Sequence, residues 1–359
     1  MLSLKLQTGQ MIVSGFEGTS LNSRTEELIV KQGIGGLILF ERNYKNPDQL
    51  RQLIEDLQSL TAQIPEVPPL FISVDQEGGR VARLGSPLTR FPPMSCLGQA
   101  DSNDLAYRFG LGMGKELRAV GVNMDYAPVL DVHSNPANPI IGHRALDSDT
   151  EKVARLGTEL IRGFYDAGVI PVGKHFPGHG DTSQDSHLTL PRVERARNSL
   201  EEIELPPFAR AIKQGLEVLM TAHVIYPAWD EKQPATFSPT ILIDVLRKSL
   251  GFEGLVMSDD LEMKAIQDKP ESIPLLGTNA GIDLFLICHD LEKVNILQNA
   301  MIQDIERGII QQSTIDQSLA RIFKVKKRLQ TSENTDLDLE DILQENHKLA
   351  QEMREYFKE

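Results

Sequence analysis

The stretch TEKVARLGTELIRGFYDAGVIPVGKHF, from Thr150 to Phe176, joins an amphipathic segment to a short apolar run. Its first part has apolar residues at helical spacing, and Gly168 stands where such a helix would end. Its second part, from Val169, is typical of a strand that is covered on both faces. Lys174 and His175 follow near the end of that run. The stretch therefore predicts one helix-strand unit of a parallel α/β fold.

The same pattern recurs along the chain. Seven further strand-like runs are MIVSGF from Met11, GLILF from Gly36, LFISV from Leu70, VNMDYAPVLDV from Val122, VLMTAHV from Val218, GLVMSDD from Gly254 and DLFLICHD from Asp283. Helical periodicity marks most segments between them. Eight such units predict a (β/α)8 TIM barrel, which typically needs about 250 residues. A doubly wound sheet is the alternative, but FEGTSL follows the first run where that fold has GxGxxG.

Composition narrows the class of protein. The chain has 359 residues, of which 40% are hydrophobic and 25% charged, as expected for a globular protein. The amino terminus has no signal-peptide pattern, and no later run is long enough to cross a bilayer, so a cytoplasmic protein is expected. A net charge of -14 opposes nucleic-acid backbones and anionic membranes. We expect a small-molecule partner, no nucleic acid, no membrane and no cofactor.

Two regions are expected along the chain. Residues 1–333 would form the catalytic barrel domain, and residues 334–359 would form an acidic helical extension. This tail either packs on the barrel or mediates self-association, and the sequence leaves both open. We expect a monomer or a weak homo-oligomer.

Polar residues follow the strand-like runs. In (β/α)8 barrels the chemistry lies at the carboxyl ends of the strands. The residues at those ends are Asp75, Asp131, His133, Lys174, His175, His223, Asp259, Asp260 and His289. This distribution predicts a site at the carboxyl end of the barrel.

The segment KHFPGHGDTSQDSHLTLP, from Lys174 to Pro191, is long and rich in glycine, as functional lids are. It offers possible metal ligands in His175, His179, Asp181 and His187. The HxH that barrel metallohydrolases usually carry after the first strand is missing, however, and we predict no metal site. As a plain turn, the segment would use His179 and Asp181 to cap backbone groups.

The same segment also suits acid/base chemistry. Asp185 and His187 would lie on one side of an extended chain, where Asp185 can fix the tautomer of His187. The run SDDLEM supplies a carboxylate as nucleophile at the end of the seventh strand. Only one of Asp259 and Asp260 would face the substrate if strand geometry continues to that point. A carboxylate and a proton donor at a barrel mouth suit double displacement at an acetal carbon.

With these residues in view, the chain resembles the bacterial β-N-acetylglucosaminidases of glycoside hydrolase family three, the cytoplasmic kind that recycles cell-wall fragments. The resemblance runs from GGLILFERNYKNPDQL through VDQEGGRVARL, APVLDV, NPIIGHRAL, KHFPGHGDTSQDSHLTLP and MTAHVIYP to MSDDLEM. It implies a retaining exo-enzyme that acts on N-acetylglucosaminyl muropeptides. By position it implies Asp259 as nucleophile, His187 as general acid/base and Asp185 as its assistant. The sugar-binding groups that it implies are Asp75, Arg83, Arg144, Lys174 and His175.

Several alternatives remain open. In one alternative, Arg83 and Arg144 do not bind the sugar but form ion pairs that only order the barrel mouth. A neutral histidine base beside an attacking phosphate would suit a β-N-acetylglucosaminide phosphorylase on the same scaffold. A metal-dependent barrel hydrolase and a sugar sensor without turnover are the alternatives from other classes. The segment ALDSD after Arg144 departs from the family pattern, and a second α/β domain would not fit in the rest of the chain.

Overall fold

The computed structural model describes residues 2–184, 189–331 and 338–357. Its central sheet is parallel throughout and has the strand order β11-β8-β7-β6-β3-β2-β1-β12. The strands are β1 (Ile12–Ser14), β2 (Gly36–Leu39), β3 (Phe71–Val74), β6 (Met124–Asp125), β7 (Ile170–Phe176), β8 (Val218–Thr221), β11 (Leu255–Met257) and β12 (Phe285–Ile287). All eight predicted runs contribute a strand.

The two end strands of this sheet meet and close the barrel. Met257 and Leu284 form a parallel bridge, and the backbone N–H of Ser258 donates to the carbonyl of Leu284 at 2.9 Å. Beyond the bridge, the N–H of Leu261 donates to the carbonyl of Leu286 at 3.0 Å. The predicted (β/α)8 barrel is therefore confirmed.

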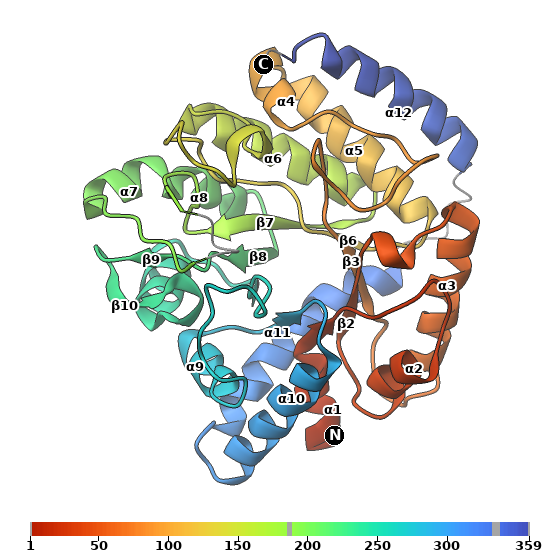
Figure 1. The fold of residues 1–359 in the computed structure, drawn as a ribbon, viewed down its shortest axis with the longest axis vertical. Coiled ribbons are helices and arrows are strands. Elements are labelled where there is room, and N and C mark those ends of the chain that lie inside the picture. Colours follow the sequence, from red (N-terminus) through yellow and green to blue (C-terminus); the bar gives the residue numbers. More distant parts are fainter. Residues whose placement is uncertain (1, 185–188, 332–337, 358–359) are drawn as a thin grey trace.

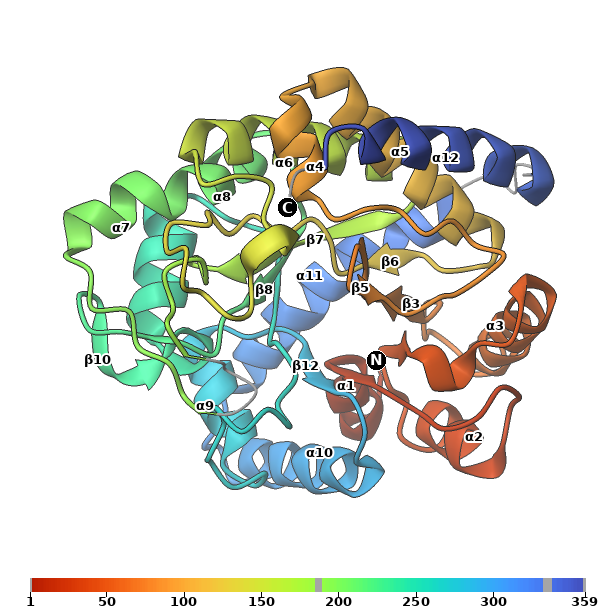
Figure 2. The same cartoon turned by 45° about the horizontal axis from the view of Figure 1, so that its top comes forward.

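Helices surround the barrel, as Figures 1 and 2 show. They are α1 (Leu4–Gln10), α2 (Ser23–Val30), α3 (Pro47–Thr61), α4 (Ser95–Ala100), α5 (Asn103–Ala119), α6 (Thr150–Asp166), α7 (Arg197–Ile203), α8 (Leu205–Lys213), the π-helix η4 (Thr240–Ser249), α9 (Ile273–Ala280), α10 (Leu291–Glu306), α11 (Gln312–Thr331) and α12 (Leu339–Arg354). Short 3-10 turns are η1 (Glu41–Asn43), η2 (Gly142–Arg144) and η3 (Ala235–Phe237). Polar caps begin several helices; the Asp149 carboxylate, for example, accepts from the N–H of Lys152 at the start of α6.

Two hairpins stand outside the barrel sheet. They are β4 (Gln76–Gly78) with β5 (Val81–Ala82), and β9 (Ile225–Tyr226) with β10 (Asp230–Pro234). The first follows β3 and the second follows β8, so both extend the carboxyl end of the barrel.

Strand β6 is much shorter than the predicted run VNMDYAPVLDV. Only Met124–Asp125 pairs regularly, because Pro128 has no N–H to donate to a neighbouring strand. Contact with β7 continues beyond β6, because the Ala127 carbonyl accepts the N–H of Val172 and the N–H of Leu130 donates to the Lys174 carbonyl. This contact aligns the next polar residue, Asp131, with the end of β7.

The carboxyl-terminal helix α12 packs on α5, beside which it lies in Figure 1. The Asn346 amide donates to the carbonyl of Gly112 at 2.9 Å and to Oε2 of Glu116 at 2.7 Å. Arg108 of α5 pairs with Glu352 at 2.7 Å. Of the two possibilities for the tail, α12 therefore shows packing on the barrel. The predicted boundary between residues 333 and 334 lies outside the described residues and stays a prediction.

No helix in the described ranges is both long and apolar enough to span a membrane.

Candidate active site

A cavity of about 260 Å³ lies at the carboxyl ends of the strands. Six of the eight predicted site residues line it: Asp75, Arg83, Arg144, Lys174, His175 and Asp259. Other lining residues include Phe40, Tyr126, His179, Asp260, Cys288 and His289. The two remaining predicted residues, Asp185 and His187, lie outside the described residues. The barrel thus brings together side chains from the ends of β3, β7 and β11 and from the loop after β6.

A buried ion network forms one wall of this cavity. The Nζ of Lys174 lies 2.7 Å from Oδ1 of Asp75 and 2.6 Å from Oε1 of Glu77. Arg144 binds both oxygens of Glu77, with Nε and Nη2 each at 2.8 Å. Burial by itself would raise the pKa of Glu77, but Arg144 and Lys174 hold it well below its usual range. Asp75 and Glu77 in turn raise the pKa of Lys174 against the effect of burial. The network is therefore charged at neutral pH.

The two predicted arginines differ. Arg144 forms the ion pair considered in the sequence analysis, with Glu77, and also lines the cavity. Arg83 forms no ion pair with any residue of the described ranges, and its guanidinium lies 5.8 Å from the ring centroid of Phe40. Its backbone is held by Gln76, whose side-chain oxygen accepts the Arg83 N–H at 2.8 Å. Arg83 thus lines the cavity as a cation that has no ion-pair partner among the described residues.

His175 is held by Asp131, a carboxylate with no exposed surface. Oδ2 of Asp131 lies 2.7 Å from Nδ1 of His175, and Oδ1 accepts the backbone N–H of His175 at 3.0 Å. Burial opposes ionisation of Asp131, yet His175 holds the pKa of this carboxyl below its ordinary value. Asp131 therefore fixes the orientation of the His175 ring through Nδ1. The other ring nitrogen, Nε2, lies 3.5 Å from Nη2 of Arg144.

The first part of the loop after β7 is closely packed. A Cβ on Gly180 would stand 1.5 Å from the carbonyl oxygen of Val132, so only glycine fits there. The Tyr226 hydroxyl donates to the carbonyl of Gly178 at 2.5 Å. The Asn138 amide donates to the carbonyl of Gly180 at 3.0 Å. The base of this loop is therefore anchored to the loops after β6 and β8.

The side chains of His179 and Asp181 contact neighbouring side chains, and His179 also lines the cavity. Nδ1 of His179 lies 2.9 Å from Oγ1 of Thr182, and burial lowers the pKa of His179 to about 4. Asp181 pairs with Arg195 at 2.7 Å. Within the described ranges, no three His, Cys, Asp or Glu side chains have the arrangement of metal ligands.

Asp259 and Asp260 both line the cavity. The expectation that only one of them would face the substrate held only if strand geometry continued to that point, and this condition is not met because β11 ends at Met257. The two carboxyls differ in charge. His175 and His223 hold the pKa of Asp259 below its ordinary value although burial opposes this. Burial raises the pKa of Asp260 to about 7. Asp259 is therefore the carboxylate that is fully ionised at neutral pH.

Sequence reasoning missed Glu77 and used Asp131 and His223 only as markers of strand ends. Glu77 stands two residues after Asp75, a spacing that puts both side chains on one side of an extended chain. That spacing was a usable signal. No comparable signal pairs His223 with the carbonyl of Asp260, 3.0 Å from its Nε2.

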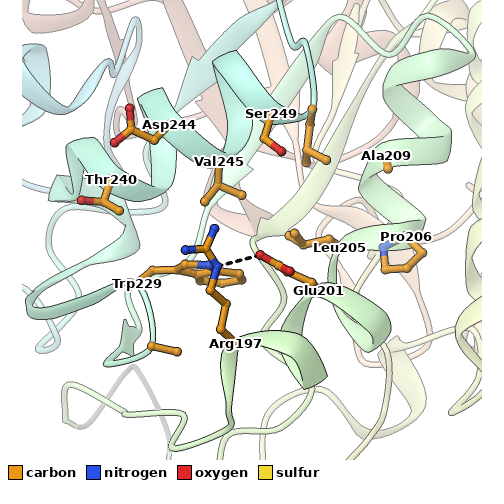
Figure 3. Close-up of a pocket in the computed structure, with 12 residues that line it drawn as sticks. Arg197, Glu201, Leu205, Pro206, Ala209, Trp229, Thr240, Asp244, Val245 and Ser249 are labelled. Carbon is orange, nitrogen blue, oxygen red and sulfur yellow. Dashed lines mark hydrogen bonds and ion pairs between the residues drawn. The ribbon is translucent and has the colours of Figure 1, made fainter.

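A larger cavity of about 580 Å³ lies on the flank of the barrel, between α7, α8 and η4 (Figure 3). Leu205, Val245 and Trp229 form part of its lining, and Arg197 pairs there with Glu201 at 2.8 Å. None of the predicted site residues lines it. We therefore assign the chemistry to the smaller cavity, where charged side chains converge.

An ionised carboxylate among hydrogen-bonding side chains at a (β/α)8 barrel mouth is the arrangement of a glycosidase. Residues 3–325 match the glycosyl hydrolase family 3 N terminal domain. The chain belongs to glycosyl hydrolase family 3.

Individual relatives agree with this assignment. A β-hexosaminidase of Alkalilimnicola ehrlichii is 43% identical over 294 residues, which are 79% of this chain and 82% of that protein. The β-N-acetylglucosaminidase of Paenibacillus sp. str. FPU-7 superposes with a TM-score of 0.95 at 41% identity, over 99% of this chain and 69% of that chain. NagZ from Neisseria gonorrhoeae, solved with N-trifluoroacetyl-D-glucosamine, has a TM-score of 0.76 at 30% identity, over 95% of this chain and 98% of that chain.

Proposed function

We propose that the protein is a retaining exo-β-N-acetylglucosaminidase that removes non-reducing terminal N-acetylglucosamine from β-glycosides. The observation that carries the proposal is the ionised Asp259 in a cavity walled by Asp75, Lys174 and His175. The relatives named as β-hexosaminidases and β-N-acetylglucosaminidases support the sugar specificity. Muropeptide fragments of peptidoglycan recycling in the cytoplasm are the proposed substrates.

Asp259 acts as the nucleophile. Its carboxylate attacks the anomeric carbon while His187 gives a proton to the leaving oxygen, and a glycosyl-Asp intermediate forms. His187 then removes a proton from water, which attacks the anomeric carbon and releases Asp259. An imidazole, with an ordinary pKa of about 6.5, serves in both steps near neutral pH. Asp185 orients His187, and both assignments rest on the DSH motif.

The other proposed residues bind the sugar. Asp75 accepts hydrogen bonds from hydroxyl groups, and its orientation is supported by the contact with Lys174 at 2.7 Å. Arg83 and Arg144 donate to hydroxyl oxygens or to a substrate carboxylate. Lys174 and His175 are the other two proposed sugar-binding residues that line the cavity. We also propose that residues 1–333 form the catalytic domain and residues 334–359 its helical extension.

The experiment that tests this function follows the turnover of 4-nitrophenyl N-acetyl-β-glucosaminide by proton NMR, with and without phosphate. β-Configured free sugar as the first product in both samples is the expected result. First formation of the α-anomer would contradict double displacement. Accumulation of sugar phosphate would identify the phosphorylase alternative. Activity lost on chelation and restored by a metal ion would favour the metal-dependent hydrolase.

A further inference from the structure

A buried carboxylate behind the sugar-binding wall has no role in the proposed reaction as it stands. Within the described residues, Asp131 makes three hydrogen-bond contacts, all of them to β7 or to the loop that follows it. Oδ2 lies 2.7 Å from Nδ1 of His175, and Oδ1 accepts the backbone N–H groups of His175 at 3.0 Å and of His179 at 2.8 Å. Both oxygens of the carboxylate are therefore engaged, and the side-chain partner among these contacts is the ring of His175.

The chemistry of these partners requires a hydrogen on Nδ1 of His175. An ionised carboxylate only accepts, so Nδ1 of His175 must donate to Asp131. In a neutral imidazole, Nε2 then holds a lone pair. Arg144 only donates, and its Nη2 is 3.5 Å from Nε2, which agrees with an acceptor at that position. His175 itself lines the cavity.

We propose that Asp131 is a positioning residue, which fixes the tautomer of His175 so that Nε2 presents an acceptor to a hydroxyl or amide N–H of the sugar. This proposal deepens the proposed function and rests on it for the identity of the sugar. It also gives His175 a specific role in the sugar site, that of a hydrogen-bond acceptor. The polar wall then offers Lys174 and Arg144 as donors, and His175 and Asp75 as acceptors. Such a mixed set suits a ligand whose hydroxyl groups both donate and accept.

The same carboxylate, Asp131, contacts both His175, which lines the cavity, and the loop after β7. Because Oδ1 is shared by the N–H groups of His175 and His179, a substitution that removes both oxygens would disturb the loop as well as the ring. Asp131→Asn separates the two effects. Its amide oxygen still accepts the two backbone N–H groups, whereas its NH2 group faces Nδ1 of His175 and forces the ring hydrogen onto Nε2.

The first readout is kinetic. Asp131→Asn should lower kcat/KM on 4-nitrophenyl N-acetyl-β-glucosaminide by about 100-fold, a moderate loss for a tautomer error in an active site. Asp181→Asn is the matched control, because it also removes one negative charge from this region but its partner is Arg195. Its kcat/KM should stay within about 2-fold of wild type.

The second readout asks whether Asp131 acts through His175. In a His175→Ala background, Asp131→Asn should change kcat/KM by less than about 3-fold, because the partner is gone. An undiminished loss in that background would overturn the proposal and assign Asp131 to the backbone of the loop.

The third readout needs no substrate. Nitrogen-15 NMR of the imidazole groups should show the His175 hydrogen on Nδ1 in the wild type and on Nε2 in Asp131→Asn. A wild-type hydrogen on Nε2, whether alone or together with one on Nδ1, would also overturn the proposal, because Nε2 would then donate. Because this measurement is independent of turnover, its failure is distinguishable from a failure of the proposed N-acetylglucosaminidase activity.

Discussion

Nζ of Lys174 lies 2.6 Å from Oε1 of Glu77, and the two side chains are only 2% and 1% exposed. Glu77 also binds the guanidinium of Arg144 with both oxygens. One buried carboxylate therefore contacts two cations that line the cavity. Without it, Lys174 would keep its contact with Asp75, but Arg144 would lose its bidentate partner in a region with little solvent to screen its charge.

The first prediction concerns this carboxylate. Glu77→Gln should lower the free energy of unfolding by about 3 kcal/mol, because it leaves two buried cations without a full counter-charge. It should also lower kcat/KM by about 100-fold, since Lys174 and Arg144 lose their fixed positions. Chemical denaturation and steady-state kinetics measure the two effects. Glu151→Gln is the control, because Glu151 pairs with Arg210 at the surface. Wild-type kinetics in Glu77→Gln would show that sugar binding by Lys174 and Arg144 does not depend on Glu77.

The second prediction separates the neighbouring carboxyls. Asp259→Asn should reduce kcat by at least about 10⁴-fold, since the nucleophile is lost. Asp260→Asn should remain active at pH 6, where the pKa of about 7 already keeps Asp260 largely protonated. Its difference from wild type should grow above pH 8, where the wild-type group is charged. Mass spectrometry with a slow fluorosugar substrate should find the glycosyl group on Asp259. A glycosylated Asp260 would reverse the assignment.

The third prediction concerns the proposed acid/base. His187→Ala should lose about 10²–10⁴-fold in kcat/KM on a substrate with a poor leaving group, because the leaving oxygen needs a proton. With 4-nitrophenol as the leaving group the loss should be clearly smaller. The two substrates are compared at the same pH with the same enzyme preparation. Equal losses on both would argue against proton donation by His187.

The fourth prediction concerns stability and pH. Lys326 is buried next to the amino ends of β1 and β3, where its Nζ donates to Oε1 of Gln10 at 2.9 Å and lies 4.9 Å from the Phe71 ring centroid. Burial lowers the pKa of Lys326 to about 7 from an ordinary value of 10.5. The unfolded chain therefore holds this proton more tightly than the folded protein does. Stability should be lowest below pH 7 and should rise as the pH increases from 7 towards 10.5.

Lys326→Met tests this linkage. The variant should lack this part of the pH dependence. Its stability relative to wild type should therefore be higher at pH 6 than at pH 10, by on the order of 2–4 kcal/mol. The lost hydrogen bond to Gln10 costs about 1 kcal/mol and does not vary with pH. Denaturation curves at pH 6, 8 and 10 measure the difference. A constant difference across this range would show that Lys326 titrates normally.

The fifth prediction concerns the carboxyl-terminal helix. Asn346→Ala should lower the free energy of unfolding by about 2 kcal/mol, because Oε2 of the buried Glu116 loses its amide donor. The neighbouring His347→Ala, on the exposed face of α12, should change it little. Urea denaturation of both variants gives the comparison. Equal stability of the two variants would mean that the contact between Asn346 and Glu116 contributes little to the fold.

The sequence by itself determined the architecture. Apolar runs that alternate with amphipathic helices can bury their strands only through parallel pairing, and eight units close a barrel. Each predicted run contributes a strand because burial on both faces leaves a clear hydrophobic pattern. The length of β6 was predicted poorly, since Pro128 ends its regular pairing in a way that hydrophobicity does not report.

The sequence also determined the end of the barrel that carries the site, because parallel strands bring all their carboxyl ends to one rim. Six predicted residues line one cavity there for that reason. Which charges pair across the rim was decided only by the tertiary structure. Arg144 meets Glu77 across 67 residues, and Lys174 meets Asp75 across 99. Such partners are chosen by the order and stagger of strands around the barrel, and local sequence carries no record of that geometry.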